Sequence, residues 1–387
     1  MKKKKGKIPA IMTLLLLGSI LAGLTILDMV TPDRKFSSYE NRILASRPAF
    51  SFESLFNGSY TADYGTYVTD QFVYRDGWIT WKTATDAVLG KTEVGGVYLA
   101  TDKTLIEQHL PEEINEADVE KCLTLLAKLE AWQEEAGGSF RVMLVPTADN
   151  ILTDKLPAYA AYYDQQELQN KLLSTLNDNN VINVTGSLLE HKQEKIYYGT
   201  DHHWTTLGAY YGYLAWAESM GVTGVSYNVE RVSESFLGTL HSAVGLPVAP
   251  DVIEAYQPES LKEGGKGMQV YYDFAEEPVD TLYAPSHLGT KNQYAYFLDD
   301  NHPFIRIETG TTDPAAAGKS LFVIKDSYAN CMIPFLTEHY ETVYVLDLRY
   351  YNAGLFALLE DCREEKEMDI LVLYNVIHFI ENFRYRE

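Results

Sequence analysis

Residues 321–330 read LFVIKDSYAN, and this stretch decides the fold class. Its first four residues are apolar, which is typical of a short strand buried on both faces. Lys325, Asp326 and Ser327 follow directly, and a helix is predicted over residues 328–339. A strand, a tight turn and a helix in this order indicate one unit of an α/β domain. Ser327 would then lie above the carboxyl end of the sheet, where open α/β folds keep their sites.

The same alternation continues on both sides of this unit. Short apolar runs predict four more strands, and helical spacing of apolar residues predicts further helices. The strands are predicted at residues 140–145, 181–184, 343–346 and 369–374, and the helices at 112–135, 167–176, 205–220 and 353–362. Strands interleaved with helices imply a largely parallel sheet that is covered on both faces.

Residues 224–316 differ in composition from the rest of the domain. They are rich in Gly, Pro and Tyr, and alternating runs at residues 269–274 and 304–308 predict hairpins. Long insertions in compact α/β domains often serve as lids or binding loops. We therefore expect a β-rich insertion that borders the site.

Residues 196–216 read IYYGTDHHWTTLGAYYGYLAW and place a carboxylate and two imidazoles where a Gly-Thr turn gives way to a helix. Asp201 can simply cap that helix, with His202 and His203 as ordinary side chains. Alternatively, the three side chains can ligate a metal ion. A third interpretation is that Asp201 holds His203 by one ring nitrogen and leaves the other free to take a proton from a nucleophile.

The combination of a serine at one strand end with an Asp-x-His in another loop favours the third interpretation, in which His203 takes a proton from a nucleophile. Ser327 alone is explained equally well as a helix cap, and its turn lacks the glycines of a G-x-S-x-G elbow. Catalytic groups nevertheless converge regardless of chain order. We predict Ser327 as nucleophile, His203 as its base and Asp201 as the group that orients His203. Such acyl transfer needs no metal and no other cofactor.

Metal-dependent hydrolysis by Asp201, His202 and His203 is the weaker alternative, because adjacent histidines on a tight turn do not easily direct both rings to one ion. Other candidates for oxyanion or substrate contacts lie at strand ends or within the two motifs, although each is also explained as a cap, a turn or a salt bridge. These candidates are Thr147, His202, Trp204, Lys325, Tyr328, Arg349 and Asn375.

The amino terminus predicts a membrane anchor. Lys2, Lys3, Lys4, Lys5 and Lys7 precede an apolar run over residues 8–27, which is long enough to cross a bilayer as a helix. The lysines should remain inside, so that the rest of the chain lies outside the cell membrane after a single pass. A cleaved signal peptide is the alternative, although its apolar core is usually shorter, about 7 to 15 residues.

We expect three segments: an anchor over residues 1–30, a membrane-proximal segment over 31–108 that packs on the main domain, and an α/β domain over 109–387. With 54 acidic and 32 basic residues the chain has a net charge of −22, which argues against a nucleic-acid partner. Three cysteines are an odd number and too few for a disulfide framework.

The motifs also resemble a known family. Asp201-His202-His203-Trp204, together with IKDSYAN at residues 324–330 and PFL at 334–336, resembles the DHHW protein family. More distantly, the chain is similar to the alginate O-acetylation proteins AlgJ and AlgX, which have an SGNH-hydrolase-like domain. The weaker parts of the resemblance are Glu40-Asn41-Arg42, Val145-Pro146, Leu156-Pro157 and Asp347-Leu348-Arg349.

This resemblance implies a three-layer α/β/α sandwich outside the cytoplasm and O-acetyl transfer to, or removal from, a polysaccharide. A membrane-bound O-acyltransferase often supplies the acyl group in such systems. The family pattern falls on Asp201, His203 and Ser327, but no G-D-S-L block is visible and the oxyanion donors are not assigned. A non-catalytic polysaccharide-binding or scaffold protein of the envelope is the alternative from a different class.

Overall fold

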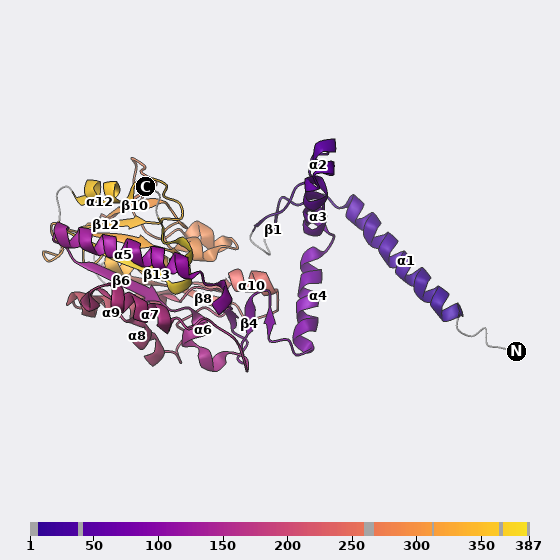
Figure 1. Ribbon diagram of the computed structural model, residues 1–387, viewed down its shortest axis with the longest axis horizontal. Coiled ribbons are helices and arrows are strands. Elements are labelled where there is room, and N and C mark those ends of the chain that lie inside the picture. The colour runs from indigo at the N-terminus through magenta and orange to yellow at the C-terminus, as the bar shows by residue number, and fades with distance from the viewer. Residues whose placement is uncertain (1–6, 38–41, 259–266, 312, 364–366, 385–387) are drawn as a thin grey trace. The chain divides into compact units, whose positions relative to one another are not determined.

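The computed structural model describes residues 7–37, 42–258, 267–311, 313–363 and 367–384. Lys2 to Lys5 of the predicted anchor and the Glu40-Asn41 pair lie outside these residues. The chain divides into two compact units, Met1–Lys91 with Ser242–Leu246 and Thr92–His241 with Pro247–Glu387. Figure 1 traces both along the chain.

The first unit is mainly helical. Its elements are α1 (Lys7–Val30), β1 (Phe36–Ser37), β2 (Arg42–Ile43), α2 (Phe52–Phe56), α3 (Ser59–Gln71) and α4 (Arg75–Val88). Within α1, Pro9–Val30 is long and apolar enough to cross a membrane, a test that a signal sequence near the N-terminus also passes. Asp28, near the end of α1, accepts a hydrogen bond from the Val73 N–H at 3.1 Å.

The second unit is built on a six-stranded sheet with the order β6-β13-β11-β12-β10-β9. The first four of these strands are parallel to one another, and β10 and β9 continue the sheet in antiparallel fashion. The strands are β6 (Phe140–Val145), β9 (Gln269–Tyr272), β10 (Phe304–Glu308), β11 (Lys319–Lys325), β12 (Thr342–Leu346) and β13 (Glu367–Asn375). The predicted α/β fold with a mostly parallel sheet is confirmed.

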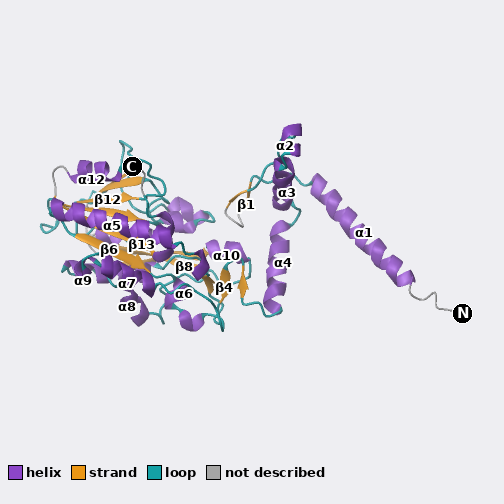
Figure 2. Cartoon of the chain, in the orientation of Figure 1, coloured by secondary structure: helices purple, strands orange, loops and turns teal. Residues whose placement is uncertain are grey.

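Helices cover both faces of the sheet, as Figure 2 shows. Side chains alternate along β11: Phe322 and Ile324 pack in one buried cluster, and Leu321 and Val323 in the other. The first cluster includes side chains of α5 (Glu116–Ala136), α7 (Gln166–Thr175), α12 (Leu355–Arg363) and α13 (Val376–Asn382). The second includes side chains of α8 (Val184–Glu190), α9 (Thr206–Met220) and α11 (Ile333–Leu336). This arrangement is a three-layer α/β/α sandwich.

Smaller elements complete the unit. A three-stranded sheet consists of β3 (Glu93–Val94), β4 (Val97–Leu99) and β5 (Leu105–Glu107). A hairpin consists of β7 (Tyr227–Phe236) and β8 (Asp251–Pro258). The short helices are α6 (Ala148–Ile151) and α10 (Thr239–Val244). Helix α10 crosses the boundary between the two units.

The two alternating runs of the insertion are strands: β9 and β10 pair with each other in antiparallel fashion and extend the main sheet. Two local predictions were wrong. Residues 181–184 form no strand: Val181 makes a single bridge to Val142, and α8 begins at Val184. The helix expected over 328–339 is a 3-10 turn, Ser327–Cys331, followed by the short α11. Pro334 near the start of α11 has no N–H to continue a helix from the preceding turn.

Candidate active site

Ser327 lies at the end of a buried central strand. It follows β11 and opens the 3-10 turn, and Asp326 caps this turn by accepting the Tyr328 N–H at 3.0 Å. The serine is 6% exposed. Because β11 is flanked by β13 and β12 in parallel, the turn lies at the edge where the carboxyl ends of these strands meet.

The Asp-His-His-Trp loop is held by a buried carboxylate from the β7–β8 hairpin. Asp251 accepts hydrogen bonds from the Gly199 N–H at 3.0 Å, from the Thr200 N–H at 2.7 Å and from the Thr200 hydroxyl at 2.6 Å. Thr205 then caps α9 by accepting the Gly208 N–H. The loop is therefore fixed immediately before and after the residues of interest.

The structure brings the three predicted residues into one hydrogen-bonded chain. His203 Nε2 lies 2.8 Å from Ser327 Oγ, and His203 Nδ1 lies 2.5 Å from Asp201 Oδ1. Asp201 also accepts the Thr239 N–H at 2.9 Å and the Thr239 hydroxyl at 3.1 Å. With Asp201 ionised, Nδ1 donates to it, which leaves Nε2 to accept the serine proton.

The protonation states suit this direction of proton transfer. Burial alone would raise the pKa of Asp201, but His202 and His203, which attract the carboxylate when they are protonated, and the hydrogen bond from His203 hold it well below its ordinary value. Burial, reinforced by His202, lowers the pKa of His203 to about 4 despite the attraction of Asp201. At neutral pH His203 is therefore an uncharged base beside an ionised carboxylate, as activation of a serine requires.

Two rings lie with their centroids 3.9 Å from that of His203, and nothing in the sequence indicated one of them. Tyr294 stacks on His203 with ring centroids 3.9 Å apart and an angle of 14°, and its hydroxyl donates to the Ser327 carbonyl oxygen at 3.0 Å. Tyr294 comes from the segment predicted to border the site, but no motif marked it. The His202 ring lies 3.9 Å from that of His203, and its Nδ1 contacts Thr239 Oγ1 at 2.8 Å.

The geometry does not favour the metal interpretation. Asp201, His202 and His203 each offer a ligand atom, all within 4.8 Å of one another. However, both ring nitrogens of His203 are engaged by Asp201 and Ser327, and His202 Nδ1 is engaged by Thr239. An ion at this position would have to replace these hydrogen bonds.

Lys325 and Arg349 belong to a buried ion-pair network. Arg349 binds Asp347 through Nε at 2.9 Å and Nη2 at 2.6 Å, and Lys325 Nζ lies 3.3 Å from the same carboxylate. Lys325 also donates to Asn330 at 2.8 Å. These contacts indicate that the Lys325 and Arg349 side chains stabilise the fold through ion pairs and hydrogen bonds.

Thr147 and Asn375 also have structural partners. The Thr147 hydroxyl donates to Asp149 at 2.6 Å. Asn375 caps α13 by accepting the His378 N–H at 2.8 Å, and its amide donates to Asp326 at 2.9 Å. These contacts fix the Asn375 side chain and leave one N–H of its amide without a hydrogen-bond partner among the described residues.

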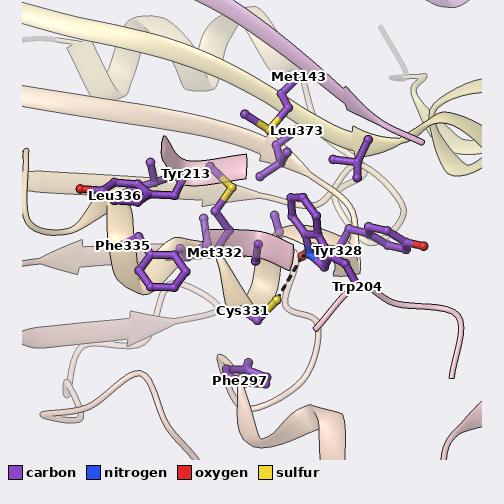
Figure 3. Packing of buried hydrophobic residues seen from close by; sticks show 14 of the residues in the cluster. Met143, Trp204, Tyr213, Phe297, Tyr328, Cys331, Met332, Phe335, Leu336 and Leu373 are labelled. Atoms are coloured by element: carbon purple, nitrogen blue, oxygen red, sulfur yellow. Dashed lines mark hydrogen bonds between the residues drawn. The ribbon is translucent and has the colours of Figure 1, made fainter. Parts of the chain in front are cut away.

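Trp204 and Tyr328 join the two loops inside the core. Both are 0% exposed, and their rings lie 5.8 Å apart (Figure 3). Trp204 Nε1 donates to the Tyr328 carbonyl oxygen at 2.7 Å, and the Tyr328 hydroxyl donates to the His202 carbonyl oxygen. These bonds hold the histidine loop against the serine turn, so the two residues support the site from beneath.

A cavity of about 410 Å³ lies beside these loops. His202 and Tyr328 line it, together with Thr147 and Asn375. It also contains His109 and His378, which had no recognisable pattern in the sequence. Residues from the ends of β6 and β13 and from the sheet of β3, β4 and β5 thus line one cavity next to the serine turn.

Gly238 allows Asp201 to occupy its position. A Cβ on Gly238 would lie 2.3 Å from both Cβ and Oδ2 of Asp201. We expect Gly238→Ala to displace the carboxylate from His203 and to lower the turnover of an activated ester by about 10- to 100-fold. The hydrolysis of p-nitrophenyl acetate and the thermal unfolding of the variant measure the two effects.

Gly289→Ala is the matched control, because a Cβ there meets nothing within 4 Å. It should keep wild-type turnover. Undiminished turnover in folded Gly238→Ala would contradict the role of this close approach.

Comparisons with known proteins agree with this fold. The family model described as DHHW protein matches residues 135–346, more than half of the 387-residue chain. A DHHW family protein from Eubacterium siraeum is similar in structure, with 22% identity, a TM-score of 0.59 and coverage of 74% of this chain and 93% of that one. Bacillus cereus PatB1 with a sulfonyl adduct gives 21% identity and a TM-score of 0.59 over 75% and 97% of the two chains.

The O-acetyltransferase domain of Pseudomonas putida AlgJ is more distant, with 14% identity and a TM-score of 0.43 over 74% of this chain and 92% of that domain. A comparison with curated proteins gave no match. At these identities the Eubacterium siraeum protein and PatB1, each with a TM-score of 0.59, show a shared fold.

Proposed function

The chain belongs to the DHHW protein family, and we propose that it is a serine-dependent O-acyltransferase or esterase. The observation that carries the proposal is the chain of hydrogen bonds from Asp201 through His203 to Ser327, at 2.5 and 2.8 Å. A buried carboxylate, an uncharged imidazole and a serine at a strand end are the groups that acyl transfer through a serine ester requires.

The reaction proceeds in two halves. His203 Nε2 takes the proton of Ser327 as Oγ attacks the acyl carbonyl carbon, and the leaving group departs with that proton. An incoming hydroxyl or water then gives its proton to His203 and attacks the serine ester, and Oγ recovers the proton when its bond to the acyl carbon breaks. The Ser327 N–H, the first amide of the 3-10 turn, is our candidate oxyanion donor, since the first amides of such turns have no partner within the turn.

The acetyl group and the polysaccharide acceptor come from the resemblance to the alginate O-acetylation proteins. In the same proposal α1 anchors the chain in the cell membrane with a single pass, and residues 31–91 form a membrane-proximal segment. The segment ends at Lys91 and not at residue 108, because the sheet of β3, β4 and β5 belongs to the second unit. The α/β domain of the second unit then acts outside the cell, and a membrane-bound O-acyltransferase supplies the acyl group.

An acyl-enzyme burst tests the proposal. The purified full chain in detergent, mixed with p-nitrophenyl acetate, should release one equivalent of p-nitrophenolate before steady turnover, because the first half-reaction leaves Ser327 acetylated. Since the pKa of His203 is lowered to about 4, the burst rate should stay close to its neutral-pH value down to about pH 5. Stopped-flow absorbance measures both.

Release of p-nitrophenolate without a burst, together with no acetylated protein in the intact mass after rapid quenching, would count against a serine ester. A burst rate that falls with an apparent pKa near 6.5 would contradict the assignment of buried His203 as the base.

A further inference from the structure

His378 lines the cavity next to the serine turn and also contacts Asp326, the residue before the proposed nucleophile. His378 lies in the first turn of α13, where its N–H donates to Asn375 Oδ1 at 2.8 Å. Its Nδ1 lies 2.9 Å from Asp326 Oδ2. Asp326 is 0% exposed and directly precedes Ser327, whereas the His378 side chain is 25% exposed and lines the cavity. The ring thus connects the residue next to the nucleophile with the open space.

The orientation of His378 follows from these contacts. Asp326 also accepts the N–H and the side-chain amide of Asn375, at 3.1 and 2.9 Å, so its carboxylate is fixed. With Nδ1 directed at Asp326, Nε2 lies on the far side of the ring. The ring is 5.9 Å from that of His202, which in turn packs against His203. His378 therefore lies near the proposed triad without taking part in it.

We propose that this cavity binds the acyl acceptor as an uncharged, hydroxyl-bearing sugar, and that His378 Nε2 makes a hydrogen bond to an acceptor hydroxyl. The inference rests on the proposed function, since it concerns the second half-reaction of the same site. A volume of about 410 Å³ is within the range of small-ligand pockets.

The charges around the cavity favour an uncharged acceptor. His109 is already held between Asp149, at 3.1 Å, and Glu107, at 3.5 Å. His378 faces Asp326 in the same way. No Lys or Arg is among the described residues that line the cavity, and Glu113 and Glu381 add negative charge. An acidic sugar would therefore meet carboxylates without a spare cation, whereas neutral hydroxyls can both donate and accept here.

In this arrangement His378 orients the acceptor, and His203 remains the base. One acceptor hydroxyl gives its proton to His203 Nε2 and attacks the acetyl carbon on Ser327 Oγ. The bond between that carbon and Oγ then breaks, and Oγ takes the proton back. A hydrogen bond from His378 to the same sugar favours its hydroxyl over water by holding it near the ester.

His378→Asn tests the role of Nε2. The asparagine amide can still donate to Asp326, as Nδ1 does, but nothing replaces Nε2. We expect the ratio of acetyl transfer to hydrolysis to fall about tenfold, because one hydrogen bond to the acceptor is lost. The assay uses the full chain, p-nitrophenyl acetate as donor, and cellotriose, maltotriose, N-acetylated chitotriose or trigalacturonate as acceptor. Mass spectrometry quantifies acetylated sugar and free acetate.

Both products arise from one acyl-enzyme, so the ratio does not depend on how fast Ser327 is acetylated. His378→Gln, whose amide reaches closer to the position of Nε2, should restore most of the ratio. The matched control is His287→Asn: His287 makes a similar 2.7 Å contact with Asp299 and is 27% exposed, but it does not line the cavity. It should keep the wild-type ratio.

The outcomes separate the two proposals. A wild-type chain that forms no acyl-enzyme overturns the proposed function itself. An acyl-enzyme with an unchanged ratio in folded His378→Asn overturns the role of His378 alone. Hydrolysis without transfer to any of the three neutral sugars, or preferred transfer to trigalacturonate, overturns the uncharged-sugar site.

Discussion

Ser327→Ala is expected to lower kcat/KM for p-nitrophenyl acetate by about 10³-fold or more, while the protein stays folded. In the proposed mechanism the hydroxyl is the nucleophile, and its contact with His203 at 2.8 Å is the interaction that alanine removes. The strand, the Asp326 cap and the Trp204–Tyr328 contacts that shape the turn do not involve Oγ. Steady-state turnover and thermal unfolding measure activity and stability separately.

Ser320→Ala is the matched control for this prediction. Ser320 is a buried serine on the same strand, β11, but it lies at the opposite end from Ser327. It should retain turnover within about twofold of wild type. If Ser327→Ala kept more than a tenth of the wild-type activity, another group would have to be the nucleophile.

Asp201→Asn is expected to lower kcat/KM by about 10³- to 10⁴-fold. An amide can donate to Nδ1 of His203, which favours the tautomer with the proton on Nε2, and that nitrogen then cannot accept the serine proton. The change also removes the charge that the Thr239 N–H and hydroxyl contact at 2.9 and 3.1 Å. Turnover of the same ester measures the loss.

Asp299→Asn provides the comparison, because Asp299 pairs with His287 at 2.7 Å outside the cavity. It should leave turnover unchanged. A folded Asp201→Asn protein with activity within tenfold of wild type would show that His203 does not depend on this carboxylate.

The central α/β unit could be predicted because its strands have strong local signals. The run LFVI is apolar on both faces, and the structure places it in the middle of the sheet with parallel neighbours. The rule that parallel strands end at one edge also placed the serine turn correctly. The Asp-x-His loop follows no strand of this sheet: it lies between α8 and α9 and is held by Asp251.

Contacts between distant segments could not be predicted in this way. Tyr294 and Asp251 act on the site through the fold of residues 224–316, and His109 and His378 reach the cavity from opposite parts of the chain. None of them has a neighbour in sequence that would mark a role. Likewise, the alternation in residues 304–308 is compatible with any antiparallel strand, and its pairing with β12 depends on packing across 33 or more intervening residues.

The site of covalent modification by a fluorophosphonate tests the central claim most directly. The full chain should take up one equivalent of the reagent, and peptide mapping by mass spectrometry should place it on Ser327. His203→Ala should abolish the modification, because Ser327 then has no base. A full-length protein that remains unmodified, or that carries the adduct on another residue, would contradict the account.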